Sequence, residues 1–487
     1  MRAAAIAALA LLGGCMVGPD YKRPEVPTPA AYRYEPQSVA QTADTQWWKA
    51  FGDPVLDGYI AEALAHNKNV QIAVANVEQA AGVLTTTRSP LFPQVNYQAD
   101  ATRQRVNELS GTPLAGFGGN PQTTYQVLAG ASWEIDLWGR IRRLTESARA
   151  NLLATDEARR GVVLSLVASV ASTYLQLLGL DEQLEIAQRT LDTYGQSVKL
   201  FELQNKYGQV SKMNVEQARS QYETAAAQIP VIKQQIVQTE NALAVLLGRN
   251  PGPIARGKKL DALLLPTVPA GLPSTLLERR PDLLQAEQTL IAANAQIGAA
   301  KAQYFPAISL TGALGSASPE LRNLFTGPAG VWSYGGAIIG PIFTGGAIAG
   351  QVAQAEGGQK AALASYELSI QNAFADVENA LASNANLGEQ LAAQGRLVKA
   401  LSEYSRLARL QFNGGYTSYT TVLQAEQQLF PSELNLASIR AQLYGSLVNL
   451  YKALGGGWVD RADGLAPQPS AAALPPRDPS PAATPTR

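Results

Sequence analysis

The residue types that enzymes most often use for acid–base and metal chemistry are scarce in this sequence. Its 487 residues include one His, one Cys and three Met, so the usual metal and general-base sets, and a thioether path for Cu(I), have little support. Asp53-Pro54 is a helix-start signal, and the helix is predicted to run to about Arg88. His66 lies in this helix and is interpreted as an ordinary surface residue. Gly345 and Gly346 occur at a predicted strand-to-helix corner, where they permit a tight bend. The sequence therefore predicts no catalytic residues, no metal site and no cofactor, and an enzyme is the least favoured class of function.

Cys15 is the one residue for which the sequence predicts a covalent modification. It follows a basic N-terminus, an apolar run from Ala3 to Leu12 and two glycines. This run is shorter than the about 20 apolar residues that span a bilayer, so residues 1–14 are predicted to be a signal peptide. The arrangement resembles a bacterial lipobox, in which the thiol is diacylated and the chain is cut before the Cys; the alternative is a chance buried Cys. Met16, in place of Asp, favours sorting to the outer membrane, where acyl chains anchor without spanning.

Composition argues against one class of partner and marks both ends of the chain. Charged residues make up 16% of the sequence and the formal net charge is zero, against roughly 25% charged residues in typical soluble proteins, so nucleic acid is not expected as a partner. Residues 15–52 are rich in Pro and are interpreted as an extended N-terminal arm packed along the body. Residues 457–487 are rich in Pro, Ala and Ser and are predicted to be a disordered tail, because such a composition cannot bury a core.

The longest periodic stretch predicts a helix with a coiled-coil seam. Apolar residues recur at steps of three and four from Val163 to Phe201 and then separate into two rows with seven-residue spacing, which is the pattern of helices that pack at a shallow angle. The rows are Leu177, Leu184, Leu191 and Val198, and Leu180, Ala187, Tyr194 and Phe201. No Pro occurs between Arg140 and Gln209, and such a helix would extend roughly 100 Å. An extended structural coiled coil is one interpretation.

Two stretches with period two predict strands. Apolar residues alternate with polar ones from Gln94 to Thr102 and from Thr124 to Leu137. Each stretch is long enough to cross a membrane as a tilted strand, which needs about 9–11 residues. A solvated antiparallel hairpin shows the same alternation, so the strands alone leave both interpretations open. Aromatic residues of these and two later strands are candidates for an interfacial girdle. They are Tyr97, Tyr125, Trp133, Trp138, Trp332 and Tyr334.

The order of helix, hairpin and long helix pair occurs twice. Residues 53–250 and 272–456 form the two copies, and residues 251–271 link them. Leu91-Phe92-Pro93 is matched by Tyr304-Phe305-Pro306, and the turn 207–211 by 414–418. Four transmembrane strands cannot close a barrel alone, because open edges leave unpaired backbone groups in hydrocarbon and single-chain bacterial barrels begin at eight strands. If the strands cross a membrane, several copies of the chain must complete one barrel, with the long helices forming a tube beneath it.

The ordered motifs along the chain resemble the outer-membrane factors of tripartite efflux systems, which are TolC-like, and within them the NodT/OprM lipoprotein branch. They are Gly14-Cys15 with residues 17–24, Trp47-Trp48 with residues 51–54, residues 133–140, residues 272–282 and residues 450–458. The resemblance implies a mixed α and β membrane protein: a homotrimer with a twelve-stranded outer-membrane barrel and a long periplasmic α-helical barrel. It also implies a periplasmic adaptor and an inner-membrane pump, typically of the resistance-nodulation-division (RND) class.

A periplasmic coiled-coil adaptor or adhesin is the structural alternative to this family. It explains the helices, but it does not explain four alternating strands at matched places. The exported substrate, and the pump and adaptor that this chain serves, are not encoded in the sequence.

The turns 207–211 and 414–418 join the long helices in pairs and are predicted to form the periplasmic tip. In the family this tip constricts the resting duct and meets the adaptor, and relatives often carry Asp where this chain has Thr417, so an acidic cation-binding ring is not expected here. Closure would then rest on bulky side chains such as Phe412, Tyr416 and Tyr419, unless these aromatics serve in packing alone. The candidate gate and docking residues are Tyr207, Gly208, Val210, Ser211, Phe412, Gly414, Gly415, Tyr416, Thr417 and Tyr419.

Overall fold

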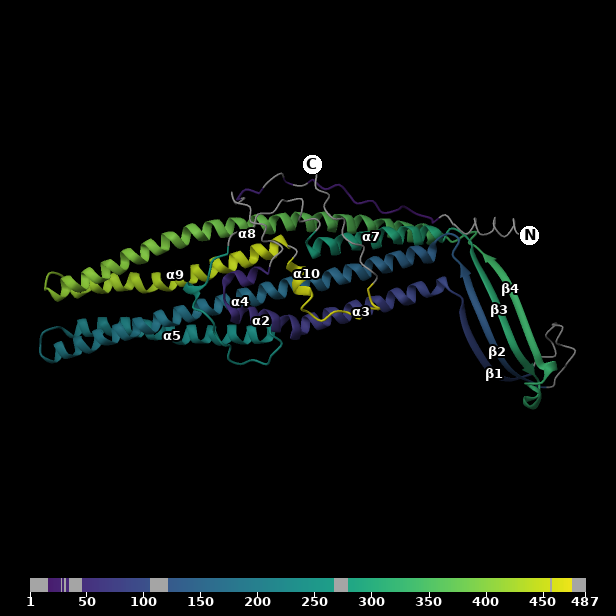
Figure 1. Ribbon diagram of the computed structural model, residues 1–487, viewed down its shortest axis with the longest axis horizontal. Helices are drawn as coiled ribbons and strands as arrows, with labels where there is room; N and C mark the ends of the chain where they lie inside the picture. The colour runs from purple at the N-terminus through teal and green to yellow at the C-terminus, as the bar shows by residue number, and fades with distance from the viewer. Residues whose placement is uncertain are drawn as a thin grey trace.

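The computed structural model shows an elongated molecule with a sheet at one end and helices along its length (Figure 1). It describes residues 16–27, 29, 32–34, 46–105, 121–266, 279–455 and 458–474. The predicted signal peptide and Cys15 lie outside the described residues, and so do residues 267–271 of the predicted linker.

The sheet has four antiparallel strands in the order β1-β2-β3-β4. They are β1 (Gln94–Gln104), β2 (Gln122–Ile135), β3 (Ala307–Ser318) and β4 (Gly330–Ile339). Directly paired residues share a face, and Tyr97, Ala129, Leu314 and Trp332 form one such row across the sheet. The register gathers most of the large apolar residues on this face and places Asn96 and Gly130 on the other, together with Leu128, Val331 and Ile339. The predicted alternation is therefore continuous across the sheet, and both β1 and β4 are edges within the chain.

Eight α-helices are described along the rest of the chain. They are α2 (Pro54–His66), α3 (Lys68–Arg88), α4 (Arg140–Lys206), α5 (Lys212–Leu246), α7 (Pro281–Ala302), α8 (Ala347–Asn413), α9 (Tyr419–Leu454) and α10 (Trp458–Asp463). Short 3₁₀ turns are η1 (Trp47–Phe51), η2 (Ser89–Leu91), η4 (Leu260–Ala262), η6 (Leu321–Asn323) and η7 (Gly327–Ala329). At 67 residues each, α4 and α8 extend about 100 Å, as the sequence predicted.

One predicted helix is two helices in the structure. The stretch expected to run unbroken from Pro54 to Arg88 is interrupted at Asn67, whose backbone is extended. The Asn67 side-chain oxygen accepts hydrogen bonds from the backbone N–H groups of Asn69 and Val70, which is the action of a helix N-cap. His66 is the exposed last residue of α2.

The long helices pack in a fixed order around α4. Near the sheet α4 packs against α3 and α7, and farther away it packs against α5 and α9, whereas the helices that pack extensively against α8 in the described residues are α7 and α9. Figure 1 shows α8 along one long side of the molecule and α3 and α5 along the other. An 18-residue stretch of α4 is apolar enough to cross a bilayer, but 61% of it is buried inside the chain. It is therefore a core helix, and its seam residues Leu177, Ala187 and Phe201 are buried.

Glycines with positive φ mark the internal repeat. Gly139, Gly208 and Gly248 recur at a constant spacing of 207 residues as Gly346, Gly415 and Gly455, and all six adopt the left-handed backbone that favours Gly. The constant spacing means that α4 and α5 correspond to α8 and α9 residue by residue, without insertion.

The N-terminal arm lies along α7 and α8, as predicted. The Val17 N–H donates to the Trp138 carbonyl at 3.1 Å, at the corner where β2 leads into α4. Farther on, the Tyr21 hydroxyl donates to Glu287 of α7 at 3.1 Å, and the backbone N–H of Arg33 donates to Glu378 of α8 at 3.1 Å. The arm therefore fastens the sheet end of the molecule to its middle.

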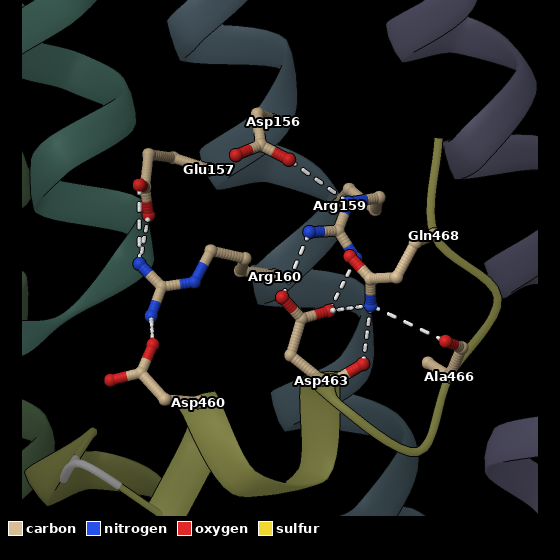
Figure 2. Close-up of polar contacts among 8 residues, drawn as sticks. All are labelled: Asp156, Glu157, Arg159, Arg160, Asp460, Asp463, Ala466 and Gln468. Atoms are coloured by element: carbon tan, nitrogen blue, oxygen red, sulfur yellow. Dashed lines mark hydrogen bonds and ion pairs between the residues drawn. The ribbon is translucent and has the colours of Figure 1, made fainter. Parts of the chain in front are cut away.

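The prediction of a disordered tail from residue 457 is wrong for residues 458–474. Trp458 of α10 is fully buried beside Trp48, with the ring centroids 5.8 Å apart. Figure 2 shows Asp463 of α10 paired with Arg159 of α4, and Asp460 paired with Arg160. The composition of the tail concealed this packing because its anchors are one Trp and two Asp whose counter-ions lie about 300 residues earlier.

Candidate functional site

The two hairpin tips are built by the same helix-ending motif. In the first tip the Gly208 N–H donates to the Asn205 carbonyl and the Gln209 N–H donates to the Gln204 carbonyl. This pair of bonds is the Schellman motif, which needs a left-handed residue at the position of Gly208. The second tip repeats it at Gly415, with bonds from Gly415 to Phe412 and from Tyr416 to Gln411. Each long helix therefore ends sharply, and its partner helix begins after a turn of five residues, 207–211 in the first tip and 414–418 in the second.

Three aromatic rings join the two hairpins just behind the tips. The ring centroid of Tyr419 lies 4.1 Å from that of Phe201 and 5.5 Å from that of Phe412. Tyr419 is buried, and burial together with the nearby Glu426 raises the pKa of its hydroxyl to about 12. Phe201 belongs to α4, so this cluster ties the second hairpin to the first. The structure thus places Phe412 and Tyr419 in packing contacts.

The exposed residues of the tips are different ones. Tyr416 is 87% exposed and Tyr207 is 69% exposed, and the Tyr416 ring lies against Gly414, where a Cβ would come within 2.9 Å of it. The Thr417 hydroxyl lies 2.9 Å from that of Thr421, and the Asn205 amide donates to the Val210 carbonyl at 2.9 Å. Ser211 precedes α5, and its hydroxyl donates to Asn214. These hydroxyls and aromatic rings are available at the rim of the molecule.

Sequence reasoning missed a pair of ion pairs behind the tips. Glu202 of α4 binds Arg219 of α5 at 2.8 Å, and at the repeat positions Arg409 of α8 donates to Glu426 of α9 at 2.8 Å. The charges are therefore exchanged between the two hairpins. Glu426 is buried, and burial raises its pKa although Arg409 opposes this. The spacing of 207 residues between the matched turns could have revealed the exchange.

Five of the six candidate girdle residues lie on the apolar face of the sheet. Tyr97, Tyr125, Trp133, Trp332 and Tyr334 share this face through the strand register, and the Trp332 and Tyr334 rings stack with centroids 5.7 Å apart. Trp138 instead follows β2 at the corner, where its ring stacks on Phe305 at 4.5 Å and its N–H donates to the Pro306 carbonyl at 2.9 Å. Their position at a membrane interface stays a prediction.

A sheet with one apolar face and two open edges, continued by helices of about 100 Å, is one segment of a larger channel. A family model described as outer membrane efflux protein matches residues 59–249 and 272–456 of the chain. The chain belongs to the outer membrane efflux protein family. The two matched segments fall within the two copies of the internal repeat.

Individual relatives of the outer membrane efflux protein family agree with this assignment over nearly the full chain. The sequence is 38% identical to the probable efflux pump outer membrane protein TtgC of Pseudomonas putida, over 93% of this chain and 94% of that protein. It is 36% identical to the cation efflux system protein CusC of Escherichia coli, over 92% of this chain and 96% of that protein. The open-state MtrE outer membrane channel of Neisseria gonorrhoeae matches the structure with a TM-score of 0.83 and 34% identity, over 91% of this chain and 99% of that one.

Family membership fixes the setting of the fold. The chain is an efflux channel component of the outer membrane that extends into the periplasm, and its architecture is that of trimeric TolC-like channels. Its four strands are one third of a barrel, and its helices are one third of the tunnel that continues it. The family is a transport family.

Proposed function

We propose that this channel is the exit duct of a tripartite pump, which receives substrate from an RND-type inner-membrane transporter through a periplasmic adaptor. The observation that carries the proposal is the pair of Schellman-closed tips at the end of α4 and α8, about 100 Å from the sheet. An adaptor would meet the rim formed by the exposed residues Tyr207 and Tyr416 and the half-buried residues Val210 and Thr417. The aromatic cluster of Phe201, Phe412 and Tyr419 behind the rim would hold the two hairpins together while the adaptor docks.

Crosslinking in living cells tests the adaptor contact. A photoreactive amino acid in place of Tyr416 or Tyr207 should capture the periplasmic adaptor encoded beside the channel's pump. The same amino acid in place of exposed Leu368, on the middle part of α8, provides a control far from the tip. Equal capture at all three positions, or none at the tip, would contradict docking at the rim.

The range of substrates is proposed to be set by the other pump components. Relatives with 36–39% identity to this chain are named for efflux of toluene, antibiotics, solvents and cations. Because this chain is about equally identical in sequence to channels named for such different substrates, we infer that the duct itself has low selectivity. Expression of this chain in strains that lack their own outer-membrane component should restore export according to the pump supplied. If export of the same chemical class were restored whichever pump is supplied, the result would contradict this proposal.

Cys15 is proposed to carry the lipid anchor. The next residue, Met16, lies against Gly139 at the corner between β2 and α4, where a Cβ on Gly139 would come within 2.8 Å of the Met16 side chain. Acyl chains on Cys15 would thus begin beside the periplasmic end of the sheet, which is the height of the inner leaflet. The Cys15→Ser variant should lose radiolabelled palmitate and be cut incorrectly. Unchanged labelling would exclude Cys15 as the lipid site.

A further inference from the structure

The internal repeat predicts what must cover the open side of α8. Because α8 corresponds to α4, it should pack against counterparts of α3, α5, α7 and α9, the four helices that contact α4 most extensively, yet among the described helices its extensive contacts are with α7 and α9. The missing neighbours are the counterparts of α7 and α9 in the other repeat, which are α3 and α5. In the same chain these two helices lie on the opposite side of the molecule (Figure 1). Only α3 and α5 of a second copy can take these places.

The exposure of the two sides agrees with this assignment. Six small residues of α8 are exposed although the α4 residues 207 positions earlier are all buried. They are Gly350, Gly357, Ala361, Ala375, Ala385 and Ala393. On α5, Arg219, Glu223 and Val237 are exposed, whereas their counterparts Glu426, Phe430 and Tyr444 on α9 are buried. The two bare surfaces therefore occupy the positions that, around α4, form the contacts with α7 and α9.

One ion pair of the contact between α4 and α9 has charged counterparts on the bare surfaces. Arg440 of α9 binds Glu182 of α4, and the positions 207 residues away are Lys233 on α5 and Glu389 on α8. The charge signs are kept, with the cation on the α5 or α9 side and the acid on the α4 or α8 side. Lys233 and Glu389 are both exposed, and in the part of the chain that the structure describes neither has an ion-pair partner.

We propose that Lys233 pairs with Glu389 of the partner subunit at each of the three interfaces of the channel. The inference rests on the trimeric channel described above and adds the residues that set the register between neighbouring helices. The contact between α4 and α9 also shows that the repeat does not conserve every ion pair. Its second ion pair, Arg189 with Glu433 at 3.1 Å, has Arg396 and Ala226 as counterparts, which cannot pair.

Cysteine crosslinking in the full-length protein tests the proximity. The variant with Lys233→Cys and Glu389→Cys, treated in membranes with a short bis-maleimide, should yield covalent dimers and trimers on denaturing gels. Each single variant should yield none, which also controls for Cys15. Lys233→Cys combined with Arg406→Cys is the matched negative control, because Arg406 is exposed on α8 about 25 Å farther along the helix.

Charge exchange tests the pairing itself. Lys233→Glu or Glu389→Lys alone places like charges at every interface and should lower the trimer-to-monomer ratio roughly threefold or more in detergent at low salt. The double exchange should restore the ratio. Trimers that neither crosslink through these positions nor recover in the double variant would overturn the proposed pair and leave the channel intact. A wild-type chain that is monomeric in membranes would instead overturn the channel assembly on which the inference rests.

Discussion

Tyr416 is the residue of the tip that is best placed to obstruct a duct. Phe412 and Tyr419 are held in the buried aromatic cluster with Phe201, whereas the Tyr416 ring is held only over Gly414. We expect Tyr416→Ala to raise single-channel conductance in planar bilayers while the trimer is kept, because removal of the ring widens the rim without loss of packing. Phe412→Ala, in contrast, should lower the free energy of unfolding of the tip by about 2–3 kcal/mol, because it removes a ring from a partly buried cluster.

Tyr207→Ala is the matched control for this measurement, because Tyr207 is also exposed at a tip but follows the first long helix. If Tyr416→Ala leaves the conductance unchanged, the constriction lies elsewhere along the tip and all three aromatics of the second hairpin serve packing or docking.

Glu426 makes the stability of the second hairpin depend on pH. Burial raises the pKa of its carboxyl above the ordinary value, so the folded state binds this proton more tightly than the unfolded state. The contribution of Glu426 to stability is therefore greatest at pH values below its ordinary pKa and falls as the pH rises through the raised one. Relative to Glu426→Gln, the wild-type protein should lose melting temperature as the pH rises from about 4, near the ordinary carboxyl pKa, through the raised pKa of Glu426.

Arg219→Gln is the control for the pH measurement, because Arg219 forms an exposed ion pair with Glu202 at the matching place in the first hairpin. Parallel melting profiles of wild type and Glu426→Gln over this pH range would contradict a role for Glu426.

The helix α10 and the segment that follows it are held by ionic contacts with α4. Burial alone would raise the pKa of Asp463, but the hydrogen bonds and charge of Arg159 lower it below its usual value. We expect Asp463→Asn to weaken docking of residues 458–474 by about 2–3 kcal/mol, because it removes the carboxylate charge and leaves the buried Arg159 with an ion pair to Asp156 alone. Faster limited proteolysis at this segment would report the loss.

Asp460→Asn should cost less than about 1 kcal/mol, because Asp460 is 65% exposed and Arg160 retains Glu157. Equal protection of the segment in wild type and Asp463→Asn would show that Trp458 alone anchors it.

Elements that depend on local pattern could be predicted from the sequence, and elements that depend on distant partners could not. The period of α4 and the alternation of β2 are written in consecutive residues, so both were predicted with their approximate lengths. The break at Asn67 was missed because a single Asn inside a helical pattern is a weak signal until its side chain is seen to cap α3. The ordering of α10 was missed because it requires Arg159 and Arg160 on α4.

The candidate site was predicted as a location but not as a set of roles. Matching the two turns located both tips, yet the separation of packing residues from exposed ones depends on how the two hairpins face each other. Phe201 was read as a seam residue of α4, and its contact with Tyr419 joins segments more than 200 residues apart. No local pattern announces such a contact.

At the scale of the whole molecule, the constant spacing between the repeats gives both hairpins equal length. In a closed trimer all six tips would then end level, so that the duct finishes in a flat rim. Deletion of seven residues from each of α4, α5, α8 and α9, at matching places of their seams, should shorten the duct by about 10 Å while keeping the rim flat. The shortened trimer should form channels in bilayers but fail in export. Export at the wild-type level would show that the adaptor can bridge the difference.

The same spacing has a consequence for how such a chain can evolve. A length change in one hairpin alone would make three of the six tips extend beyond the other three. A ring-shaped partner could then not contact all six tips at once. Insertions and deletions in the tunnel are therefore tolerated only in duplicate, once in each half of the gene. Both halves must therefore keep the same helix lengths, which the 207-residue interval reflects. Their individual residues can still differ, as the exchanged charges of Arg219 and Glu426 do.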